Sequence, residues 1–394
     1  MQQEFLLSAD YIFNGTELLA DHCLTVNENG TILKLEPLTA AHKDIRFYNG
    51  IITPGFVNAH CHIELSHMQH TVSKLTGMVG FVKQVMMSKG KNFDNKETLI
   101  EMAVTRMYNN GINAVGDICN TTDALSAKLQ HPKMYFQNYI ECIGLNPERA
   151  NGSFEYGKTI ASEYGKYFAP KQVNLVPHAP YTVSPQLATY LNTTQPNSST
   201  IHNEESLAEM DFIESKSGEI IELYQFLNAP LDFFAPFHTT PLQHNLQTLL
   251  PPSGKVLLVH NCHFNESDVA FLEKYRSLQD IYFCVCPNAN LYIGNPLPDI
   301  HLLLETGKPV CIGTDGLSSN DELDILSEIK VLAAAYPAIT TVEWLTMATS
   351  NGAAAIDMED KVGYFTENTQ PGVLLLENIT EQSFAENTSC RRLF

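Results

Sequence analysis

The chain reads Pro54-Gly55-Phe56-Val57-Asn58-Ala59-His60-Cys61-His62 at the point that decides its fold, an apolar run that ends in two histidines. Residues two apart on a strand face the same side, so both imidazoles can reach one cation at about 2.0–2.1 Å. Taken alone, the pair is equally compatible with two histidines that hydrogen-bond inside a core. The stretch therefore predicts a strand that ends in two possible metal ligands. The fold that contains this strand must be inferred from the rest of the chain.

Downstream of this stretch, short apolar runs of strand type alternate with longer helical patterns. The runs cover residues 56–60, 113–118, 134–141, 173–178, 199–202, 255–260, 281–286 and 309–315, and helical patterns between them cover 96–108, 185–192, 205–216, 266–274 and 323–335. Eight strand–helix repeats in about 260 residues are typical of a (β/α)₈ barrel. We therefore expect an α/β protein whose catalytic TIM-like barrel spans residues 56–355. Segment 217–254 exceeds one crossover and is expected to add a helix and a loop over the barrel mouth.

The two chain ends have a different sequence pattern. Residues 1–55 read as short strands with Asn-Gly pairs at 14–15, 29–30 and 49–50, which are strong local hairpin signals. After residue 355 the strand-and-turn pattern returns. Residues 1–55 and 356–394 are therefore predicted to form one small β-sandwich lobe.

Composition limits the classes of partner. The formal net charge is −20, which disfavours binding to nucleic acid and to anionic lipid and favours a small-molecule substrate. The nine cysteines are scattered and contain no Cys-x-x-Cys pair, as expected in a reducing compartment. Neither a signal peptide nor a run near the roughly 18 apolar residues of a membrane span is recognisable. We expect a cytoplasmic protein without membrane contact, and the sequence leaves a homodimer open.

Metal-binding side chains stand at the ends of the predicted strands. His178 ends the fourth strand, His202 the fifth, His260 the sixth and Asp315 the eighth. In a barrel these ends meet at one rim, where catalytic residues collect. His202 and Asp315 are the best third and fourth ligands beside His60 and His62. Nitrogen and oxygen ligands without thiolate suit Zn²⁺, or alternatively Fe²⁺, with one position open for water.

Glu205 follows His202 by three residues and is placed to overhang this site if a helix begins just after the strand. A carboxylic acid there could protonate a ring nitrogen and shuttle the proton onward. The alternative is an ordinary solvated or helix-capping carboxylate.

These motifs together resemble the amidohydrolase superfamily, and within it the mononuclear deaminases and chlorohydrolases that act on nucleobase-like rings. The resemblance rests on the stretch that ends at His62, on His178-Ala179-Pro180-Tyr181-Thr182, on His202-Asn203-Glu204-Glu205, on His260-Asn261-Cys262-His263 and on Gly313-Thr314-Asp315. The stretch after His178 is similar to that of adenosine-type and aminofutalosine deaminases.

The resemblance implies a metal-dependent hydrolase that acts on a non-peptide carbon–nitrogen bond by deaminating an amino-purine-like ring. It implies His60, His62, His202 and Asp315 as metal ligands, with Glu205, His260 and Asp315 as catalytic residues and His178 as a substrate contact. His260 would orient or deprotonate a water molecule, and Glu205 would be the general acid and base. Binuclear members carry a carboxylated lysine at the end of the fourth strand, where this chain has His178, so one divalent ion is expected.

Several alternatives stay open at this stage. Glu64 is predicted as a substrate contact, but Glu64 and His67 could equally hold a ligand histidine in place. Arg106 and Arg149 are read as solvated charges, and the Phe-rich stretch 231–237 as a lid or a packed loop. Rival functions are cyclic-amide hydrolysis, triazine dechlorination and a non-catalytic metal- or ligand-binding barrel.

Overall fold

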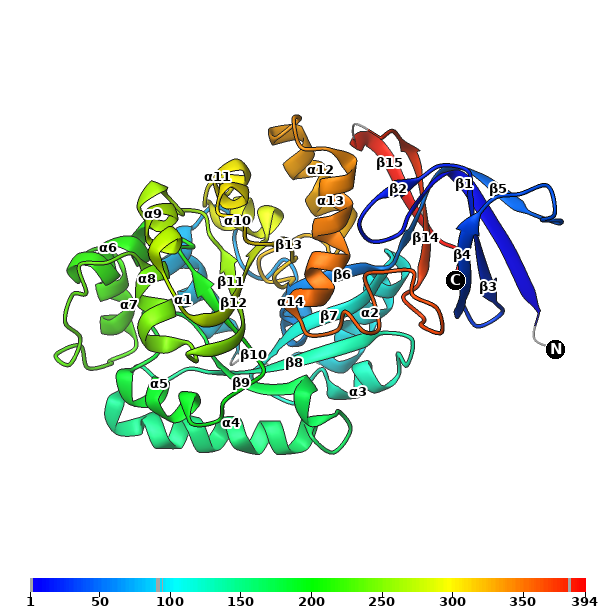
Figure 1. The fold of residues 1–394 in the computed structure, drawn as a ribbon. Helices are drawn as coiled ribbons and strands as arrows, with labels where there is room; N and C mark the ends of the chain where they lie inside the picture. The colour runs from blue at the N-terminus through cyan, green and yellow to red at the C-terminus, as the bar shows by residue number, and fades with distance from the viewer. Residues whose placement is uncertain (1–2, 90–92, 94, 382–383) are drawn as a thin grey trace.

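The protein consists of a barrel and a lobe, with both chain ends in the lobe (Figure 1). The computed structural model describes residues 3–89, 93, 95–381 and 384–394. The barrel strands are β6 (Phe56–Cys61), β7 (Ile112–Cys119), β8 (Tyr135–Cys142), β9 (Val173–Pro177), β10 (Ser198–Asn203), β11 (Ser253–His260), β12 (Leu278–Val285) and β13 (Val310–Ile312). They correspond to the eight predicted runs.

The eight strands form two parallel four-stranded sheets, β6-β7-β8-β9 and β10-β11-β12-β13. Two contacts at the rim join these halves. The His202 amide donates to the His178 carbonyl at 2.9 Å, and the Thr314 amide donates to the His60 carbonyl at 3.0 Å. Asp315 also forms a parallel bridge with Cys61. The predicted barrel is confirmed, and its closing contacts are made by the candidate site residues themselves.

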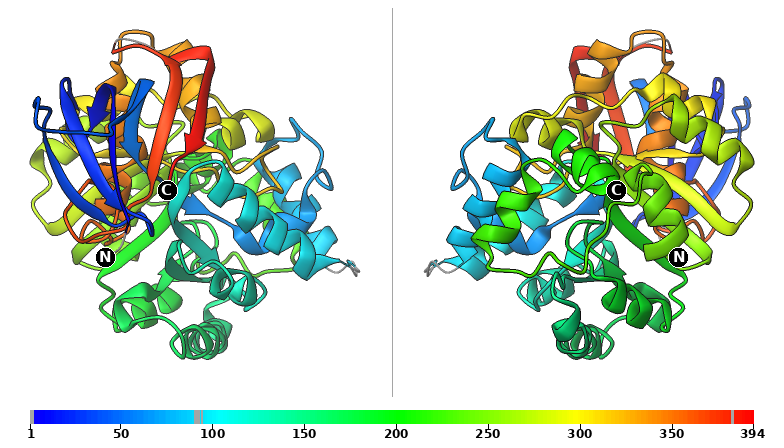
Figure 2. Two further views of the ribbon diagram at one scale, coloured as in Figure 1. Left: turned by 90° about the vertical axis from the view of Figure 1, so that its right-hand side faces the viewer. Right: turned by 90° about the vertical axis from the view of Figure 1, so that its left-hand side faces the viewer.

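Helices surround the barrel on its outer side (Figure 2). They are α2 (Lys96–Asn109), α3 (Leu125–Leu129), α4 (Ala150–Tyr164), α5 (Pro185–Asn192), α6 (Leu207–Ser215), α9 (Glu266–Lys274), α10 (Pro287–Ile293), α11 (Ile300–Glu305), α12 (Ile325–Ala335), α13 (Thr341–Ala348) and α14 (Ser350–Ala355), with short 3₁₀ turns at Ile63–Met68, Pro147–Arg149 and Pro170–Gln172. Local sequence sets several starts. The Ser184 hydroxyl accepts from the Leu187 amide, and Pro185 occupies the first turn of α5.

Two further groups of helices lie near the barrel mouth. α1 (Gly77–Lys89) follows the first strand, while α7 (Ile220–Phe226), α8 (Pro241–His244) and the π-helical turn Asn245–Leu249 occupy the long segment 217–254. The Tyr224 hydroxyl of α7 donates to the Tyr181 carbonyl at 2.9 Å, which anchors this segment to the loop after β9.

The lobe consists of strands from both chain ends. Its strands are β1 (Glu4–Phe13), β2 (Leu18–Leu19), β3 (His22–Asn27), β4 (Ile32–Pro37), β5 (Arg46–Pro54), β14 (Val373–Ile379) and β15 (Phe384–Arg392). They form one continuous mixed sheet in the order β15-β14-β5-β1-β3-β4, with β2 paired to β1. This sheet encloses its own apolar core, which includes Leu7, Leu24 and Leu375. Within the described residues, no helix has the length and apolar character needed to cross a membrane.

Candidate metal centre and active site

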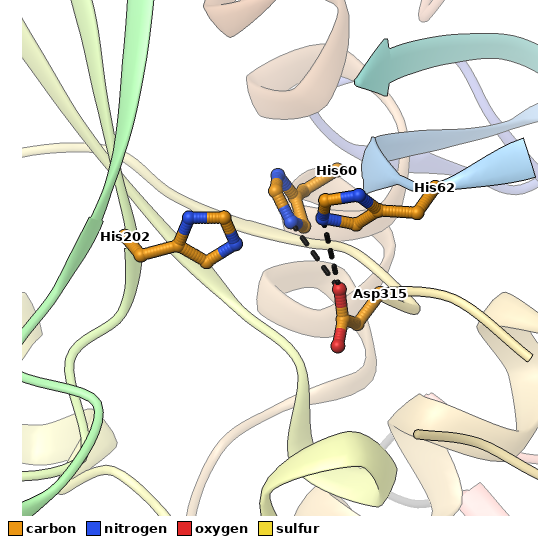
Figure 3. Close-up of side chains that lie close together, drawn as sticks. All are labelled: His60, His62, His202 and Asp315. Atoms are coloured by element: carbon orange, nitrogen blue, oxygen red, sulfur yellow. Dashed lines mark ion pairs between the residues drawn. The ribbon is translucent and has the colours of Figure 1, made fainter. Parts of the chain in front are cut away.

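Three histidines and one aspartate converge at the barrel rim (Figure 3). One possible ligand atom from each of His60, His62, His202 and Asp315 lies within 4.8 Å of the other three. Asp315 Oδ1 lies 3.5 Å from His60 Nε2 and 3.3 Å from His62 Nε2. His202 faces this group from β10, a strand of the other four-stranded sheet, with its ring centroid 5.1 Å from that of His60. All four side chains are buried. The structure thus brings together the four residues predicted as ligands.

The hydrogen bonding of these rings fits a metal centre. Neither ring nitrogen of His60 has a hydrogen-bond partner among the described residues, although the side chain is buried. His202 Nδ1 lies 2.8 Å from the His178 carbonyl, so it carries the proton and leaves Nε2 free. Metal-binding histidines typically donate their second nitrogen in this way. Burial lowers the pKa of both rings and keeps them neutral, which is the ligating form.

Asp315 is held as a carboxylate despite its burial. Burial alone would raise the pKa of its carboxyl, but His60, whose Nε2 lies 3.5 Å from Oδ1, and the neighbouring histidines hold that pKa well below its usual range. The Ser319 hydroxyl donates to its second oxygen. The buried donor set therefore suits one divalent cation, with three nitrogens and one oxygen.

The backbone is unusual where the chain leaves the strands. Glu204, His260, Asn261 and Asp315 have φ values of 50°, 78°, 56° and 55°. Non-glycine residues rarely adopt this left-handed region, and such conformations gather at functional sites. Here they turn the chain at the ends of three strands.

Glu205 lines a cavity beside the four-residue cluster, and its Oε1 lies 3.5 Å from His260 Nε2. Burial raises the pKa of its carboxyl well above the usual range, and the charges of Asp315 and Glu209 add to the effect. Both oxygens of the buried Glu209 side chain accept backbone amides, from Glu204 at 2.9 Å and from Glu205 at 3.0 Å. Glu209 therefore fixes the turn that carries Glu205.

His260 and His178 each direct one ring nitrogen away from the cavity. His260 Nδ1 lies 2.8 Å from the Asn290 amide oxygen, which leaves Nε2 on the side of Glu205. His178 Nδ1 lies 2.7 Å from the Thr182 hydroxyl. That hydroxyl donates to the Ala179 carbonyl, so it accepts from His178 Nδ1.

Glu141, at the end of β8, forms a second close group with His178 and His202. Its Oε1 lies 3.9 Å from His202 Nδ1, the nitrogen already bonded to the His178 carbonyl. This group is better suited to hydrogen bonding than to a second ion. Glu141 was not predicted as a site residue, although it ends a predicted strand in the same way as the candidate ligands.

The site opens into a cavity of about 330 Å³. Its wall includes His62, His178, His202, Glu205 and Asp315. Its other walls are largely apolar. α7 contributes Leu223, and α1 contributes Met78, Phe81, Val82, Val85 and Met86. Leu227, the residue that follows α7, also lines the cavity. α1 was not predicted from the sequence. Its lining residues recur at a spacing of three and four, which is the helical period and was the available signal.

Glu64 and His67 lie behind the site. One Glu64 oxygen accepts the Asn120 amide at 3.1 Å and the Thr121 amide and hydroxyl at 2.9 Å each. His67 Nδ1 lies 2.8 Å from the Glu64 carbonyl. Glu64 is not among the residues that line the cavity. These contacts fit a positioning role, and its predicted contact with substrate stays a prediction.

Asp117 holds the turn after His62, because its Oδ1 accepts the Ile63 amide at 2.8 Å and its Oδ2 pairs with the buried Lys128 at 2.5 Å. Arg106 and Arg149 are exposed, as expected. Within 231–237, Phe234 packs on Phe212 of α6, and no residue of the stretch lines the cavity. This stretch is therefore a packed loop and not part of the cavity wall.

The fold and site define a class of protein, and comparison with known proteins gives the same class. The model of the amidohydrolase family matches residues 51–388, so the chain belongs to this family. It is an enzyme of the type that hydrolyses carbon–nitrogen bonds other than peptide bonds, as predicted.

The three relatives described next share at most 24% sequence identity with this chain. The 5-methylthioadenosine/S-adenosylhomocysteine deaminase of Saccharophagus degradans is 24% identical over 91% of this chain and 80% of its own length. The aminofutalosine deaminase of Helicobacter pylori, solved with methylthio-coformycin, superposes with a TM-score of 0.77 at 21% identity over 96% of this chain and 94% of that one. An atrazine chlorohydrolase of Arthrobacter aurescens, solved with zinc, has a TM-score of 0.71 at 16% identity and covers 94% and 86%.

Proposed function

We propose that the protein is a hydrolytic deaminase of an amino-purine-like ring of the adenosine type. One observation carries this proposal: the buried carboxyl of Glu205 lines one cavity together with His62, His202 and Asp315, three members of the four-residue cluster. Deamination needs a hydroxide that attacks a ring carbon and an acid that protonates the adjacent ring nitrogen. This arrangement offers both groups. The named activities of the deaminase relatives agree with it.

A single divalent cation, with Zn²⁺ favoured, would be held by His60, His62, His202 and Asp315. When bound it would lower the pKa of water, so that hydroxide is available near neutral pH.

The protein groups then manage the protons. Burial raises the pKa of Glu205 and so favours its protonated carboxyl, which can donate its proton to the ring nitrogen beside the attacked carbon. His260 Nε2 is a free acceptor, because Nδ1 donates to Asn290, and it accepts or orients the proton of the attacking water. His178 Nε2 can hydrogen-bond the ring or a sugar hydroxyl. When the tetrahedral carbon collapses, Glu205 or Asp315 takes the proton of its hydroxyl group and passes it to the leaving amine, which departs as ammonia. The proton on His260 then returns to Glu205, whose Oε1 lies 3.5 Å from His260 Nε2.

The test is ammonia release from adenosine-type compounds by zinc-loaded enzyme, compared with its Glu205→Gln variant. We expect the variant to keep its metal and lose most turnover, with a fall in kcat of about 10²–10⁴-fold. Undiminished activity of Glu205→Gln would exclude this role. Chloride release from a chlorotriazine in place of ammonia from any aminopurine would favour the rival dechlorination reaction.

A further inference from the structure

Three buried asparagines, Asn245, Asn203 and Asn261, form a chain of side-chain hydrogen bonds behind the active site. The Asn245 amide group donates to Asn203 Oδ1 at 2.8 Å, and the Asn203 amide group donates to Asn261 Oδ1 at 3.0 Å. The Asn261 amide group then donates to the carbonyls of Leu258 at 2.8 Å and Cys284 at 3.1 Å. None of the three side chains can turn over without placing two donors or two acceptors face to face, so the chain has one direction.

Two of these asparagines each follow a histidine of the site. Asn203 comes directly after His202, and Asn261 comes directly after His260. Asn203 of β10 is also the residue that pairs with His260 of β11. The chain of amides therefore joins the two strand ends at which these histidines stand.

The backbone at His260 and Asn261 is left-handed at both residues, with φ values of 78° and 56°. L-residues disfavour this conformation, so two of them in succession need support from their surroundings. The Asn261 backbone amide donates to the Asn203 carbonyl at 2.9 Å, and the Asn261 side chain adds the bonds described above. Asn203 and Asn261 thus hold the turn that follows β11.

The first member of the chain lies outside the barrel strands. Asn245 begins the π-helical turn Asn245–Leu249, and single π-helical turns are frequent near functional sites. Its Oδ1 is buried without a hydrogen-bond partner among the described residues. A buried oxygen of this kind destabilises a fold, so folding alone does not account for an amide at this position. The bond to Asn203 gives the amide a reason to be there.

None of these three asparagines is among the residues that line the cavity. They can therefore affect a reaction only through the residues that they position. The turn at His260 sets the direction of its imidazole, whose Nε2 lies 3.5 Å from Glu205 Oε1. Proton transfer over such a gap is sensitive to small displacements.

We infer, resting on the proposed deaminase function, that Asn245, Asn203 and Asn261 are positioning residues for proton transfer. Together they hold the left-handed turn at His260 and keep His260 Nε2 directed at Glu205. Asn245 extends this control to segment 217–254, outside the barrel strands.

The first experiment removes the most distant member of the chain. In Asn245→Ala, Asn203 loses the donor to its Oδ1 and the single direction of the chain is lost. We expect kcat for ammonia release by the zinc-loaded enzyme to fall about tenfold or more, with KM within about threefold of the wild-type value. Unchanged kcat in Asn245→Ala would overturn the inference.

The same turn supplies a control for lost stability. Leu249 is buried there and has no polar side-chain atom. Leu249→Ala should lower Tm at least as much as Asn245→Ala, because it leaves a cavity in the core, and should keep kcat within about twofold of the wild-type value. Equal losses of kcat in the two variants would show a structural role alone and contradict positioning.

Asn261 separates the backbone from the side chain. Asn261→Gly and Asn261→Ala both lose the side-chain bonds, but glycine adopts the left-handed conformation freely. We expect both variants to have lower kcat than the wild-type enzyme, and Asn261→Gly to retain about tenfold more kcat than Asn261→Ala. Equal kcat in these two variants would contradict a role in holding the turn.

A double variant tests whether the chain acts through His260. Asn290 bonds Nδ1 of the same imidazole at 2.8 Å. The loss of kcat in Asn245→Ala/Asn290→Ala should be smaller than the product of the two single losses, because both changes act on one side chain. Losses that simply multiply would show that Asn245 acts elsewhere.

NMR of the imidazole nitrogens separates positioning from the proposed reaction. The signals of His260, assigned with His260→Gln, report its tautomer and hydrogen bonding in the zinc-loaded enzyme without substrate. We expect them to shift in Asn245→Ala and to stay unchanged in Leu249→Ala. This result together with no ammonia release by the wild-type enzyme would refute the deaminase and support positioning. Unchanged His260 signals in Asn245→Ala would refute positioning whatever the substrate.

Discussion

At His260, one hydrogen bond decides which ring nitrogen faces Glu205. Asn290 is buried on α10 and its amide oxygen lies 2.8 Å from His260 Nδ1. In Asn290→Ala the imidazole loses this partner and can present the wrong nitrogen to Glu205. We predict a fall in kcat of about 10–100-fold with metal content unchanged, measured by steady-state kinetics and metal analysis.

The same helix supplies the control. Asn288 bonds the Ser327 hydroxyl at 3.3 Å and is not among the cavity-lining residues. Asn288→Ala should therefore keep kcat within about twofold of the wild-type value. Equal losses in the two variants would point to damage of α10 and not to the orientation of His260.

The four-residue cluster makes its own prediction, because a cation that binds only the folded protein stabilises it. Treatment with a chelator should abolish ammonia release and lower Tm, and addition of Zn²⁺ should restore both. Metal analysis should give one ion per chain. His202→Ala should show neither restoration, and two ions per chain would contradict the assignment of a single site.

At the scale of elements, the turn between β10 and α6 depends on one side chain. Glu209 accepts the amides of both Glu204 and Glu205 and is fully buried. Glu209→Ala leaves two buried N–H groups unpaired and should cost about 2–4 kcal/mol of unfolding free energy, together with most of kcat, as Glu205 loses its position. Glu209→Gln keeps one acceptor and should lose less of both. Urea unfolding and kinetics on the three proteins test this order.

Some helix boundaries and strand ends could be predicted from the sequence alone. The sequence predicted that four side chains at strand ends meet at one rim, because a barrel brings the carboxyl ends of its strands together. These side chains are His178, His202, His260 and Asp315. α5 and α9 begin and end as predicted because caps and proline mark their first turns locally.

Other features depend on contacts between distant segments. Asn290 meets His260 across thirty residues, and Glu141 meets Asn120 across twenty-one, so no local pattern announces either pair. α1 had a readable apolar stripe, but only the assembled barrel shows that this stripe faces a cavity and not the core.

At the scale of the whole molecule, the lobe is tied to the strand that carries the first two histidines. β5 ends at Pro54 and β6 begins at Phe56, with only Gly55 between them. A Cβ at Gly55 would lie 2.6 Å from the Pro371 carbonyl oxygen, so the two chain ends meet there too closely for a larger residue. Arg392 of β15 also donates to the Tyr108 carbonyl at 2.8 Å, which joins the lobe to the last turn of α2. Disruption of the lobe should therefore displace His60 and His62.

The stability of the whole chain should also depend on pH through His244, which is buried against Phe237 with ring centroids 3.7 Å apart. Burial lowers the pKa of this imidazole to about 4, whereas in the unfolded chain it titrates near 6.5. Between these values the unfolded chain binds the extra proton, so stability is complete above about pH 6.5 and falls as the pH drops toward 4. The expected contribution is a loss of about 2 kcal/mol at pH 5.

The His244→Gln variant isolates this contribution, because the other histidines titrate equally in both proteins. Unfolding free energies measured from pH 7 to pH 5 should fall less steeply in His244→Gln than in the wild-type protein. His301 is exposed on α11, so His301→Gln should retain the wild-type slope. If His244→Gln also kept that slope, the imidazole would have to be protonated inside the fold, and the packing against Phe237 would have to accommodate a buried charge.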